Sequence, residues 1–452
     1  MACGTNQMLR EIVTKKRAER LFMKIGIVLH GFTQGGIERV VCRLLPQFTS
    51  KGCEVVVFSE YDREKDVYHN IPEHRRVVVG HGENRATRLA AALKTENIDI
   101  CLVEDYWIFW AARDCAVIRD IGIPYVVHIH NVFSEFFLMP EMWRDKKEWY
   151  DAFIKANALI TLSRYDEYFF RLIGCNAHYF PNPVEDVPMG FKRCEKKHEI
   201  LWLARFEEVK RPLDAIEVFR RVLERVPDAT LVMVGSLESL YGRQISEMVA
   251  ADSKLSDSVK LPGFSANVWE WYSRASVFLS TSAFEGFALT FMEAGAAGVP
   301  IVGYDLPYVE TVGGNGGFIP VKQGDVNAAA DAICRLLGDD EARAEAGAAN
   351  RATFERVKSF DQMVAYDELF DDVKAGVRVG SPSGDETAQV CLKTLAEHAM
   401  FGIAGLKDII RRDAAKIKNL KRSKRRKNRI IAALVLVVIL LSAVKIISGM
   451  AY

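Results

Sequence analysis

The sequence contains no cysteine pair with the spacing of a metal site. Its nine cysteines include no C-x-x-C, and several lie among apolar residues, as reduced cysteines in a protein core do. Residues 1–22 lack a seven-residue apolar run, so no secretory signal peptide is predicted. No G-x-G-x-x-G follows the first apolar segment, so a dinucleotide-binding loop is not predicted. These absences favour a protein of the reducing cytosol without a structural metal.

Charge is distributed unevenly along the chain. The formal net charge of the 452 residues is +1, but residues 411–452 hold twelve Lys and Arg and one acidic residue, a balance of +11 that leaves residues 1–410 at −10. The length allows two domains and an appendage. The charge pattern marks the last part of the chain as a separate cationic segment.

The C-terminal region divides into three predicted segments. Residues 376–410 form a linker and an amphipathic helix, and residues 411–429 form a basic segment. Residues 430–449 are long enough to cross a bilayer if Lys445 reaches the far interface. Basic residues on the near side predict membrane-lipid contacts and a cytosolic enzyme body. A shallow or re-entrant insertion is the alternative, whereas nucleic-acid binding is not favoured because the apolar segment follows directly.

Apolar segments and helical patterns alternate through most of the chain, after an N-terminal extension of residues 1–22. Strands are predicted at 23–29, 54–58, 76–79, 98–103, 124–130 and 158–162, and again at 199–203, 229–235, 259–263, 275–279 and from 300. Such alternation predicts α/β architecture with doubly wound parallel sheets.

The segment 280–303 carries the strongest functional pattern. It predicts a strand, a turn at Glu285-Gly286, a helix that contains Glu293, and a second strand. Two carboxylates suit a ligand rich in hydroxyls, while Gly286 and the helix N-terminus suit a phosphate. Hydroxyls together with phosphate indicate a nucleotide sugar. The alternative is that Glu285 only complements the helix dipole and Glu293 lies on a solvated face.

Other candidates lie at the ends of predicted strands. Arg205 and Lys210 flank a loop before a helix, where two cations would offset the charge of a diphosphate, although an ordinary charged loop looks the same. Gly35-Gly36 begins a helix, where backbone amides would reach a phosphate or an acceptor hydroxyl, or simply allow a tight turn. His128 and His130 share one face of a strand, although a lone histidine is more often structural.

These features together resemble the retaining glycosyltransferases of family 4, which have the GT-B fold. Glu285 to Glu293 matches the E-x7-E signature, and four further landmarks recur in the family's order over residues 23–375: Gly35-Gly36, Asn182-Pro183, Arg205 with Lys210, and Gly235. The resemblance implies two Rossmann-like domains facing a cleft. Residues 23–184 would be the acceptor-side domain, closed by a helix at 360–375, and residues 197–359 would be the nucleotide-sugar donor domain.

The resemblance also assigns roles. It makes His130 the residue that contacts the transferred sugar, with His128 as the fallback if the register is off by two. Arg205 and Lys210 would hold the diphosphate, Glu285 hydroxyls of the sugar, and Glu293 the ribose. The remaining implied donor-binding positions are Gly263, Phe264, Gly286, Phe287, Ala288 and Leu289; Phe264 would cover the base or else lie in the core.

The function expected from the sequence is a retaining, hexosyltransferase-type reaction. A sugar would move from a nucleotide diphosphate sugar to an acceptor, with a lipid-linked or cell-surface glycan precursor as the expected class. No D-x-D occurs, so neither a metal nor another cofactor is expected, and nothing in the sequence identifies an enzyme nucleophile. The alternatives are a nucleotide-sugar epimerase or hydrolase on the same scaffold, and a non-catalytic membrane scaffold.

Overall fold

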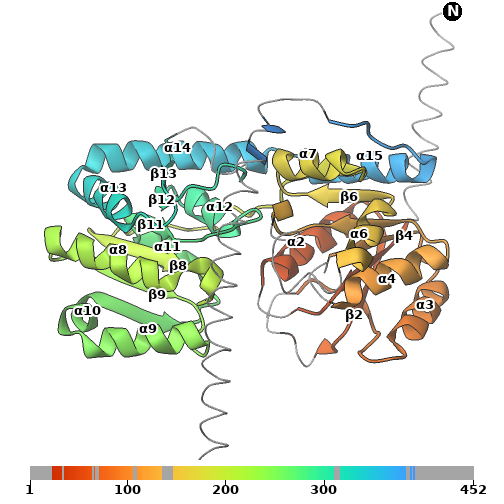
Figure 1. The fold of residues 1–452 in the computed structure, drawn as a ribbon, viewed down its shortest axis with the longest axis horizontal. Helices are drawn as coiled ribbons and strands as arrows, with labels where there is room; N and C mark the ends of the chain where they lie inside the picture. The colour runs from red at the N-terminus through yellow and green to blue at the C-terminus, as the bar shows by residue number, and fades with distance from the viewer. Residues whose placement is uncertain are drawn as a thin grey trace, which may run out of the picture.

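The computed structural model describes residues 23–32, 35–63, 66, 71–104, 109–134, 146–309, 316–382, 387–388 and 390–391. These residues form two α/β domains that lie side by side (Figure 1). The predicted N-terminal extension, the basic segment 411–429 and the apolar segment 430–449 lie outside the described residues. Within the described ranges, no helix has both the length and the apolar character needed to cross a membrane.

The first domain is built on a seven-stranded parallel sheet with the order β3-β2-β1-β4-β5-β6-β7. Most of its strands are almost wholly apolar, because helices cover both faces of a parallel sheet. The predicted strands are all present, and β7 is an addition that its short length concealed. The bounds are β1 Lys24–Leu29, β2 Glu54–Ser59, β3 Arg75–Val78, β4 Ile100–Val103, β5 Tyr125–His128, β6 Ala158–Thr161 and β7 Ala177–Tyr179.

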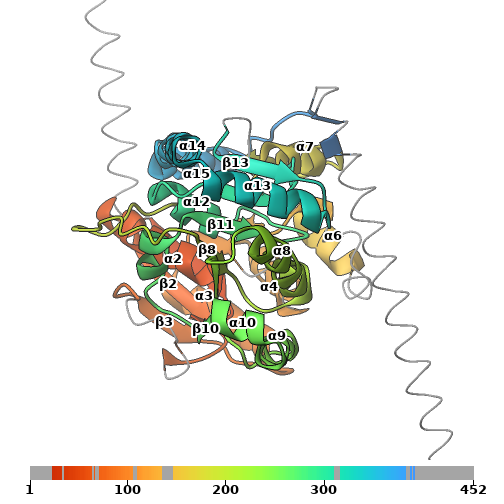
Figure 2. The same ribbon diagram turned by 90° about the vertical axis from the view of Figure 1, so that its left-hand side faces the viewer.

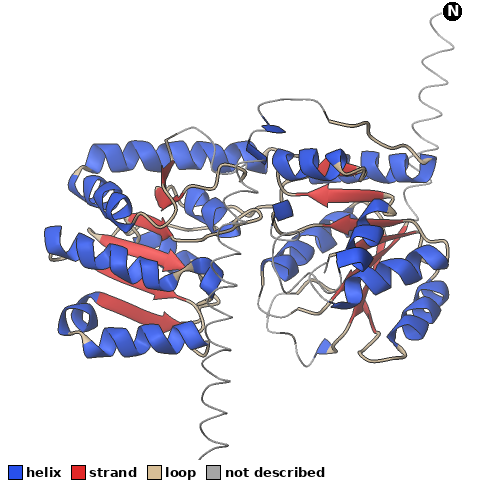
Figure 3. Cartoon of the chain, in the orientation of Figure 1, coloured by secondary structure: helices blue, strands red, loops and turns tan. Residues whose placement is uncertain are grey.

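Helices cover the two faces of this sheet (Figure 3). One face packs against the apolar side of α2, which includes Val40, Leu44 and Phe48. The other face packs against residues of α3, α4, α6 and α7. The bounds are α2 Gly36–Ser50, α3 Arg85–Glu96, α4 Phe109–Asp120, α6 Lys146–Ile154 and α7 Arg164–Leu172.

The second domain contains a six-stranded parallel sheet with the order β10-β9-β8-β11-β12-β13. Its strands are β8 Glu199–Leu203, β9 Thr230–Val234, β10 Val259–Gly263, β11 Val277–Ser280, β12 Ile301–Tyr304 and β13 Phe318–Val321. Its helices are α8 Pro212–Arg225, α9 Leu240–Ala251, α10 Ser253–Ser258, α11 Trp269–Arg274, α12 Leu289–Ala296, α13 Val326–Gly338 and α14 Asp340–Lys358, with a 3-10 turn, η3, at Glu208–Lys210. Two Rossmann-like domains were predicted, and this arrangement confirms them.

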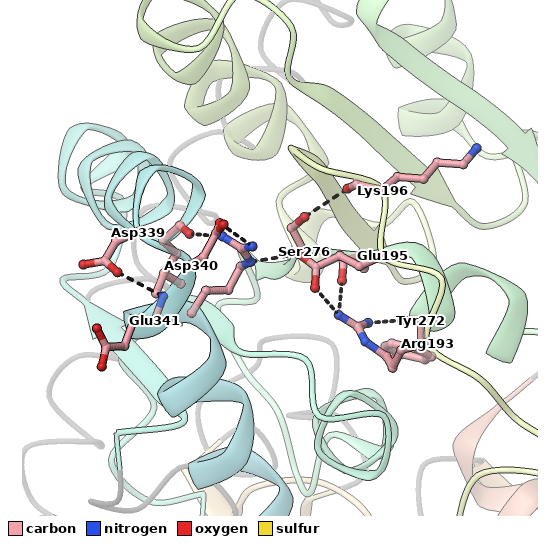
Figure 4. Close-up of polar contacts among 11 residues, drawn as sticks. Arg193, Glu195, Lys196, Tyr272, Ser276, Asp339, Asp340 and Glu341 are labelled. Atoms are coloured by element: carbon pink, nitrogen blue, oxygen red, sulfur yellow. Dashed lines mark hydrogen bonds and ion pairs between the residues drawn. The ribbon is translucent and has the colours of Figure 1, made fainter.

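The segment that joins the domains is fastened to the second one (Figure 4). Arg193 donates to the carbonyl of Tyr272 over 2.6 Å and also contacts Glu195 at 3.1 Å. The Ser276 hydroxyl donates to the carbonyl of Lys196 over 3.0 Å. The later part of this segment is therefore tied to helix α11 and to the residue before β11.

The chain returns to the first domain after α14. Helix α15, Gln362–Ala375, begins at the Asp361 cap and lies against α2. Tyr366 packs edge-on against Phe48 with 5.0 Å between ring centroids, and the Gln362 amide donates to the carbonyl of Pro181 over 2.6 Å. In both Figure 1 and Figure 2, α15 continues the direction of α14 across the junction of the domains. Helix α15 thus follows the second domain in the sequence but packs on the first domain through aromatic contacts.

Strand order reverses once in each sheet, between β1 and β4 and between β8 and β11. Open parallel sheets bind ligands beyond the carboxyl ends of their strands at such reversal points. A ligand is therefore expected to bind near the loops after β1 and β4 in the first domain and near those after β8 and β11 in the second.

Candidate active site

The loops after β8 and β11 are bound to each other. The Thr281 hydroxyl donates to the carbonyl of Lys210 over 2.8 Å, and the amide of Ala283 donates to the carbonyl of Val209 over 2.8 Å. Trp202 of β8 donates to the same Thr281 hydroxyl over 3.0 Å. These contacts hold η3 and the Glu285-Gly286 turn against each other at the reversal point of the second sheet.

Lys210 and Glu285 form an ion pair within this loop pair. Lys210 Nζ lies 2.7 Å from Glu285 Oε1, and the Ser282 hydroxyl donates to the same oxygen over 2.6 Å. The two charged side chains are only 18% and 11% exposed, so water screens them weakly. A cation and a carboxylate side by side can bind the two different parts of one ligand, a phosphate and a set of hydroxyls.

Gly286 touches the other domain. A Cβ at this position would lie 2.1 Å from the carbonyl oxygen of His130, which is shorter than any real contact. Only glycine therefore allows the turn after β11 to approach the loop after β5 this closely. The contact places Glu285 and Lys210 opposite the end of the first sheet.

His130 belongs to a buried cluster with Glu104 and His128. Oxygen Oε2 of Glu104 lies 2.9 Å from His130 Nε2 and 2.9 Å from His128 Nδ1. The His130 contact is a hydrogen bond, whereas Nε2 of His128 and Oε1 of Glu104 are buried and have no hydrogen-bond partner among the residues that the structure describes.

The charge state of this cluster follows from its burial. Burial raises the pKa of the Glu104 carboxyl, but His128 and His130 outweigh that effect and bring the pKa down to about 2. Burial, and then His128, lowers the pKa of His130 to about 4. At neutral pH a carboxylate therefore accepts a hydrogen bond from the Nε2–H of a neutral His130, which fixes the tautomer of the ring.

Glu293 is paired across the domain boundary. Its Oε1 contacts the guanidinium of Arg39 in α2, and the Tyr272 hydroxyl donates to its Oε2 over 3.1 Å. The side chain is only 4% exposed. A Cβ on nearby Gly36 would lie 3.7 Å from Leu289, so the start of α2 faces the start of α12. Glu293 therefore does not lie on a solvated face, which was the alternative drawn from its spacing.

Several predicted donor-binding residues lie outside these contacts. Arg205 pairs with Glu207 at 3.0 Å, and its side chain is 65% exposed, so it does not join Lys210 and Glu285 in their ion pair. Phe264 is 52% exposed beside Gly263, so the alternative that it belongs to the core is wrong. Phe287 and Ala288 are buried, and Ala288 begins α12 in the left-handed region at φ +58.

Three residues of the site were not predicted from the sequence: Glu104, Arg39 and Tyr272. Arg39 gave no clear signal, because Glu38 beside it already supplies a carboxylate in the first turn of α2. Glu104 directly follows a buried strand, beside the reversal point of the first sheet. Tyr272 gave no signal, because nothing in a sequence relates its hydroxyl to a carboxylate on another helix.

Comparison with known proteins defines the class. Residues 190–353 match the family model described as glycosyl transferases group 1, and residues 34–186 match the model described as glycosyltransferase family 4. The solved structure of HepE from Anabaena in complex with UDP-glucose superposes with a TM-score of 0.64 at 17% identity, over 78% of this chain and 100% of that one. Both halves of the chain thus match glycosyltransferase domain models, and the fold is GT-B.

Two curated proteins are similar to parts of this chain in sequence. Poly(glycerol-phosphate) alpha-glucosyltransferase of Bacillus subtilis (strain 168) is 27% identical over 216 residues, which are 47% of this chain and 28% of that protein. N-acetyl-alpha-D-glucosaminyl L-malate synthase of Bacillus anthracis is 27% identical over 198 residues, which are 43% of this chain and 51% of that protein. The chain thus spans 28% and 51% of the length of these relatives.

Proposed function

We propose that this protein transfers a hexose, with retention of configuration, from a nucleotide diphosphate sugar to a hydroxyl of a glycan or lipid-linked acceptor. The observation that carries the proposal is the ion pair of Lys210 with Glu285, 2.7 Å apart at the reversal point of the second sheet and opposite His130. A binding site for a nucleotide sugar needs a cation for the diphosphate and carboxylate oxygens for hydroxyls, and this pair supplies both.

Binding of the donor exchanges contacts that already exist. The diphosphate would take Lys210 from Glu285, freeing the carboxylate for hydroxyls of the sugar. The ribose would take Glu293 from Arg39. As the bond between the anomeric carbon and the diphosphate breaks, its electron pair moves to the phosphate oxygen, and the positive charge of Lys210 stabilises the growing negative charge.

Retention without an enzyme nucleophile requires the acceptor hydroxyl to attack from the face that the diphosphate leaves. The hydroxyl proton then passes to the departing phosphate oxygen as the new bond to carbon forms. Both curated relatives are named for alpha-linked products, which supports retention if the donor sugar is alpha-linked as well. The short contact of Gly286 with His130 would help to exclude water and so limit hydrolysis of the donor.

The proposal includes no metal ion, since Lys210 supplies the positive charge at the diphosphate. Glu104, His128 and His130 offer ligand atoms within 4.8 Å of one another, the right chemistry for a divalent cation, and they are the one such group in the described part of the chain. Transfer is therefore expected to persist after the protein has been dialysed against a chelator. Loss of transfer that added metal restores would assign an ion to these three residues.

The proposal places the enzyme on the cytosolic side of a membrane. It rests on the basic segment 411–429 and the apolar segment 430–449 of the sequence. Removing residues 411–452 is expected to move the protein from the membrane pellet to the supernatant. A truncated protein that still sediments with membranes would exclude the anchor.

The donor test uses the full-length protein in detergent and a panel of nucleotide sugars. A donor at 100 times its Kd raises the free energy of unfolding by about 2.7 kcal/mol, which a thermal-shift assay detects. Glu293→Ala should weaken this shift, and Lys210→Ala should chiefly slow transfer. Unchanged behaviour of both variants would remove the site assignment. Stoichiometric epimer or free sugar without acceptor would favour an epimerase or hydrolase, and binding without turnover would favour a scaffold.

A further inference from the structure

A second histidine–carboxylate cluster lies on the same edge of the first sheet. Glu60, which directly follows β2, is only 5% exposed and is contacted by two imidazole rings. His30, directly after β1, places Nδ1 2.8 Å from Oε2 of Glu60, and Nδ1 of His81, three residues beyond β3, contacts Oε1. Both carboxylate oxygens are thus occupied, and each fixes one ring.

Tyr61 completes the cluster. Its ring meets His30 edge-on with 4.7 Å between centroids and His81 with 4.8 Å. The His81 side chain is 51% exposed and that of His30 is 29% exposed. The carboxylate of Glu60 is therefore buried, whereas the rings of His30 and His81 that it contacts are partly exposed. This arrangement is typical of a binding surface and not of a protein core.

The loop that carries His81 is braced from below. Arg85, which is 4% exposed and pairs with Asp114, donates to the carbonyl of Gly80 over 2.7 Å. Arg88 donates to the carbonyl of Val79 over 2.6 Å and to that of His81 over 2.5 Å. The guanidinium groups of Arg85 and Arg88 thus donate hydrogen bonds to the carbonyls of residues 79–81. These bonds hold the loop in one conformation, as a preorganised binding site requires.

The position of the cluster relates it to the sugar that is transferred. Parallel strands lie about 4.8 Å apart, and β4 separates β1 from β5. His30 therefore lies roughly 10 Å along the sheet edge from the residues after β5, including His130. A molecule that rests on His30 and His81 could place a hydroxyl at His130.

We propose that His30, Tyr61 and His81, fixed by Glu60, form the acceptor subsite and recognise a neutral polyhydroxy unit, a sugar or a polyol. Nδ1 of each ring contacts Glu60, so Nε2 is the ring nitrogen left to bind a ligand, and a hydroxyl group suits it because a hydroxyl both donates and accepts hydrogen bonds. The Glu60 carboxylate, which contacts both rings, disfavours an anion such as phosphate at the same place. The Tyr61 ring supplies an apolar surface for the C–H face of a sugar ring. This inference rests on the proposed transferase function.

The experiment measures binding to full-length protein in detergent by saturation-transfer NMR. The probes are methyl α-D-glucopyranoside, which is neutral, and glycerol 3-phosphate, which is anionic. The glucopyranoside is expected to bind, and His81→Ala and Tyr61→Ala should each raise its Kd by about five- to tenfold, the value of one lost hydrogen bond or ring contact. Glu60→Gln should weaken the same probe, and Tyr150→Ala, an exposed tyrosine of α6, should not.

Three results would overturn the subsite: binding of glycerol 3-phosphate alone, no binding of either probe, or glucopyranoside binding that the His81 and Tyr61 variants leave unchanged. UDP-glucose binding and hydrolysis are measured on the same variants. If the subsite is right, both stay at the wild-type level in His81→Ala and Tyr61→Ala. Failure of the donor function instead appears as loss of UDP-glucose binding in the wild type, so the two failures are distinguishable.

Discussion

The two sheet edges that meet in this protein use charge in opposite ways. The second domain pairs a cation with a carboxylate, Lys210 with Glu285, in loops that are close in space and weakly exposed. The first domain buries two carboxylates, Glu60 and Glu104, beneath histidine rings. An ion pair can be opened by a charged ligand, whereas a buried carboxylate only orients its partners. One edge therefore holds an ion pair that a charged ligand can open, and the other holds imidazole rings that buried carboxylates orient.

Removal of the cation should have the largest effect. Lys210→Ala is expected to lower kcat by about 10²–10³-fold, the loss caused by deleting one group that stabilises developing negative charge. The measurement is transfer from the donor found by the thermal-shift panel. Lys254→Ala, an exposed lysine of α10, is the matched control and should leave kcat unchanged. A kcat within a few-fold of the wild type would show that Lys210 does not face the diphosphate.

The second test asks whether the ion pair of Arg39 with Glu293, which links the two domains, contributes to the stability of the protein. Arg39→Ala leaves a buried carboxylate without its cation, which should lower the free energy of unfolding by about 3 kcal/mol, near the low end for such pairs because Arg39 is a quarter exposed. Urea denaturation measures the loss. Adding Glu293→Gln should recover much of it, and Arg205→Ala, an exposed arginine, should change little. Equal stabilities of Arg39→Ala and Arg205→Ala would contradict the pairing.

The third test prevents the edges from meeting. Gly286→Ala puts a methyl group where the carbonyl of His130 lies, so the turn after β11 must move away. A shift of about 1 Å in a catalytic arrangement can cost on the order of 100-fold in rate, and kcat is expected to fall by about that factor. Gly338→Ala is the control, because a Cβ there meets no atom within 4 Å. Full activity of Gly286→Ala would mean that the contact is not needed for transfer.

Features of the fold and the site were predictable from the sequence when the residues that form them are close together along the chain. The two doubly wound domains were predictable because buried parallel strands are continuous apolar runs. Glu285, Gly286 and Glu293 were recognisable because they share one continuous segment. Short or exposed strands such as β7 gave no comparable pattern, and β13 is interrupted by Pro320.

The first sheet edge could not be predicted in the same way. His30, Glu60 and His81 follow three different strands, and only the order of those strands in the sheet brings them together. Glu104 and His130 likewise meet across two strands. For Arg205 the sequence predicted the position of the backbone in the loop after β8. It did not predict the direction of the long side chain, which pairs with Glu207 instead of joining Lys210. Contacts that depend on topology need the structure, while contacts within one segment do not.

A smaller effect is expected from the carboxylate beneath His130. Glu104→Gln replaces an acceptor by an amide that can also donate, so the ring of His130 is no longer held in one tautomer. Transfer should slow by about tenfold, the rate equivalent of about 1.4 kcal/mol and close to the value of one hydrogen bond to a charged group, with donor Kd unchanged. Glu104→Asp, which keeps the charge, should recover part of the rate. A fall in donor binding rather than in kcat would instead indicate a purely structural role.

The smallest effect concerns pH and separates the two histidine clusters. The pKa of His130 is lowered from its usual 6.5 to about 4 by burial and by His128, so the unfolded chain binds this proton more readily than the native protein does. Stability from this group is therefore complete above pH 6.5 and is lost as the pH falls towards 4, at up to about 1.4 kcal/mol per pH unit. Urea denaturation of the wild type and of His130→Gln between pH 7 and 5 measures it: the wild type should lose more stability than the variant. Parallel curves would mean that the pKa of His130 is not lowered in the native protein, and the contrast between an orienting carboxylate at the first edge and an exchangeable ion pair at the second would then fail.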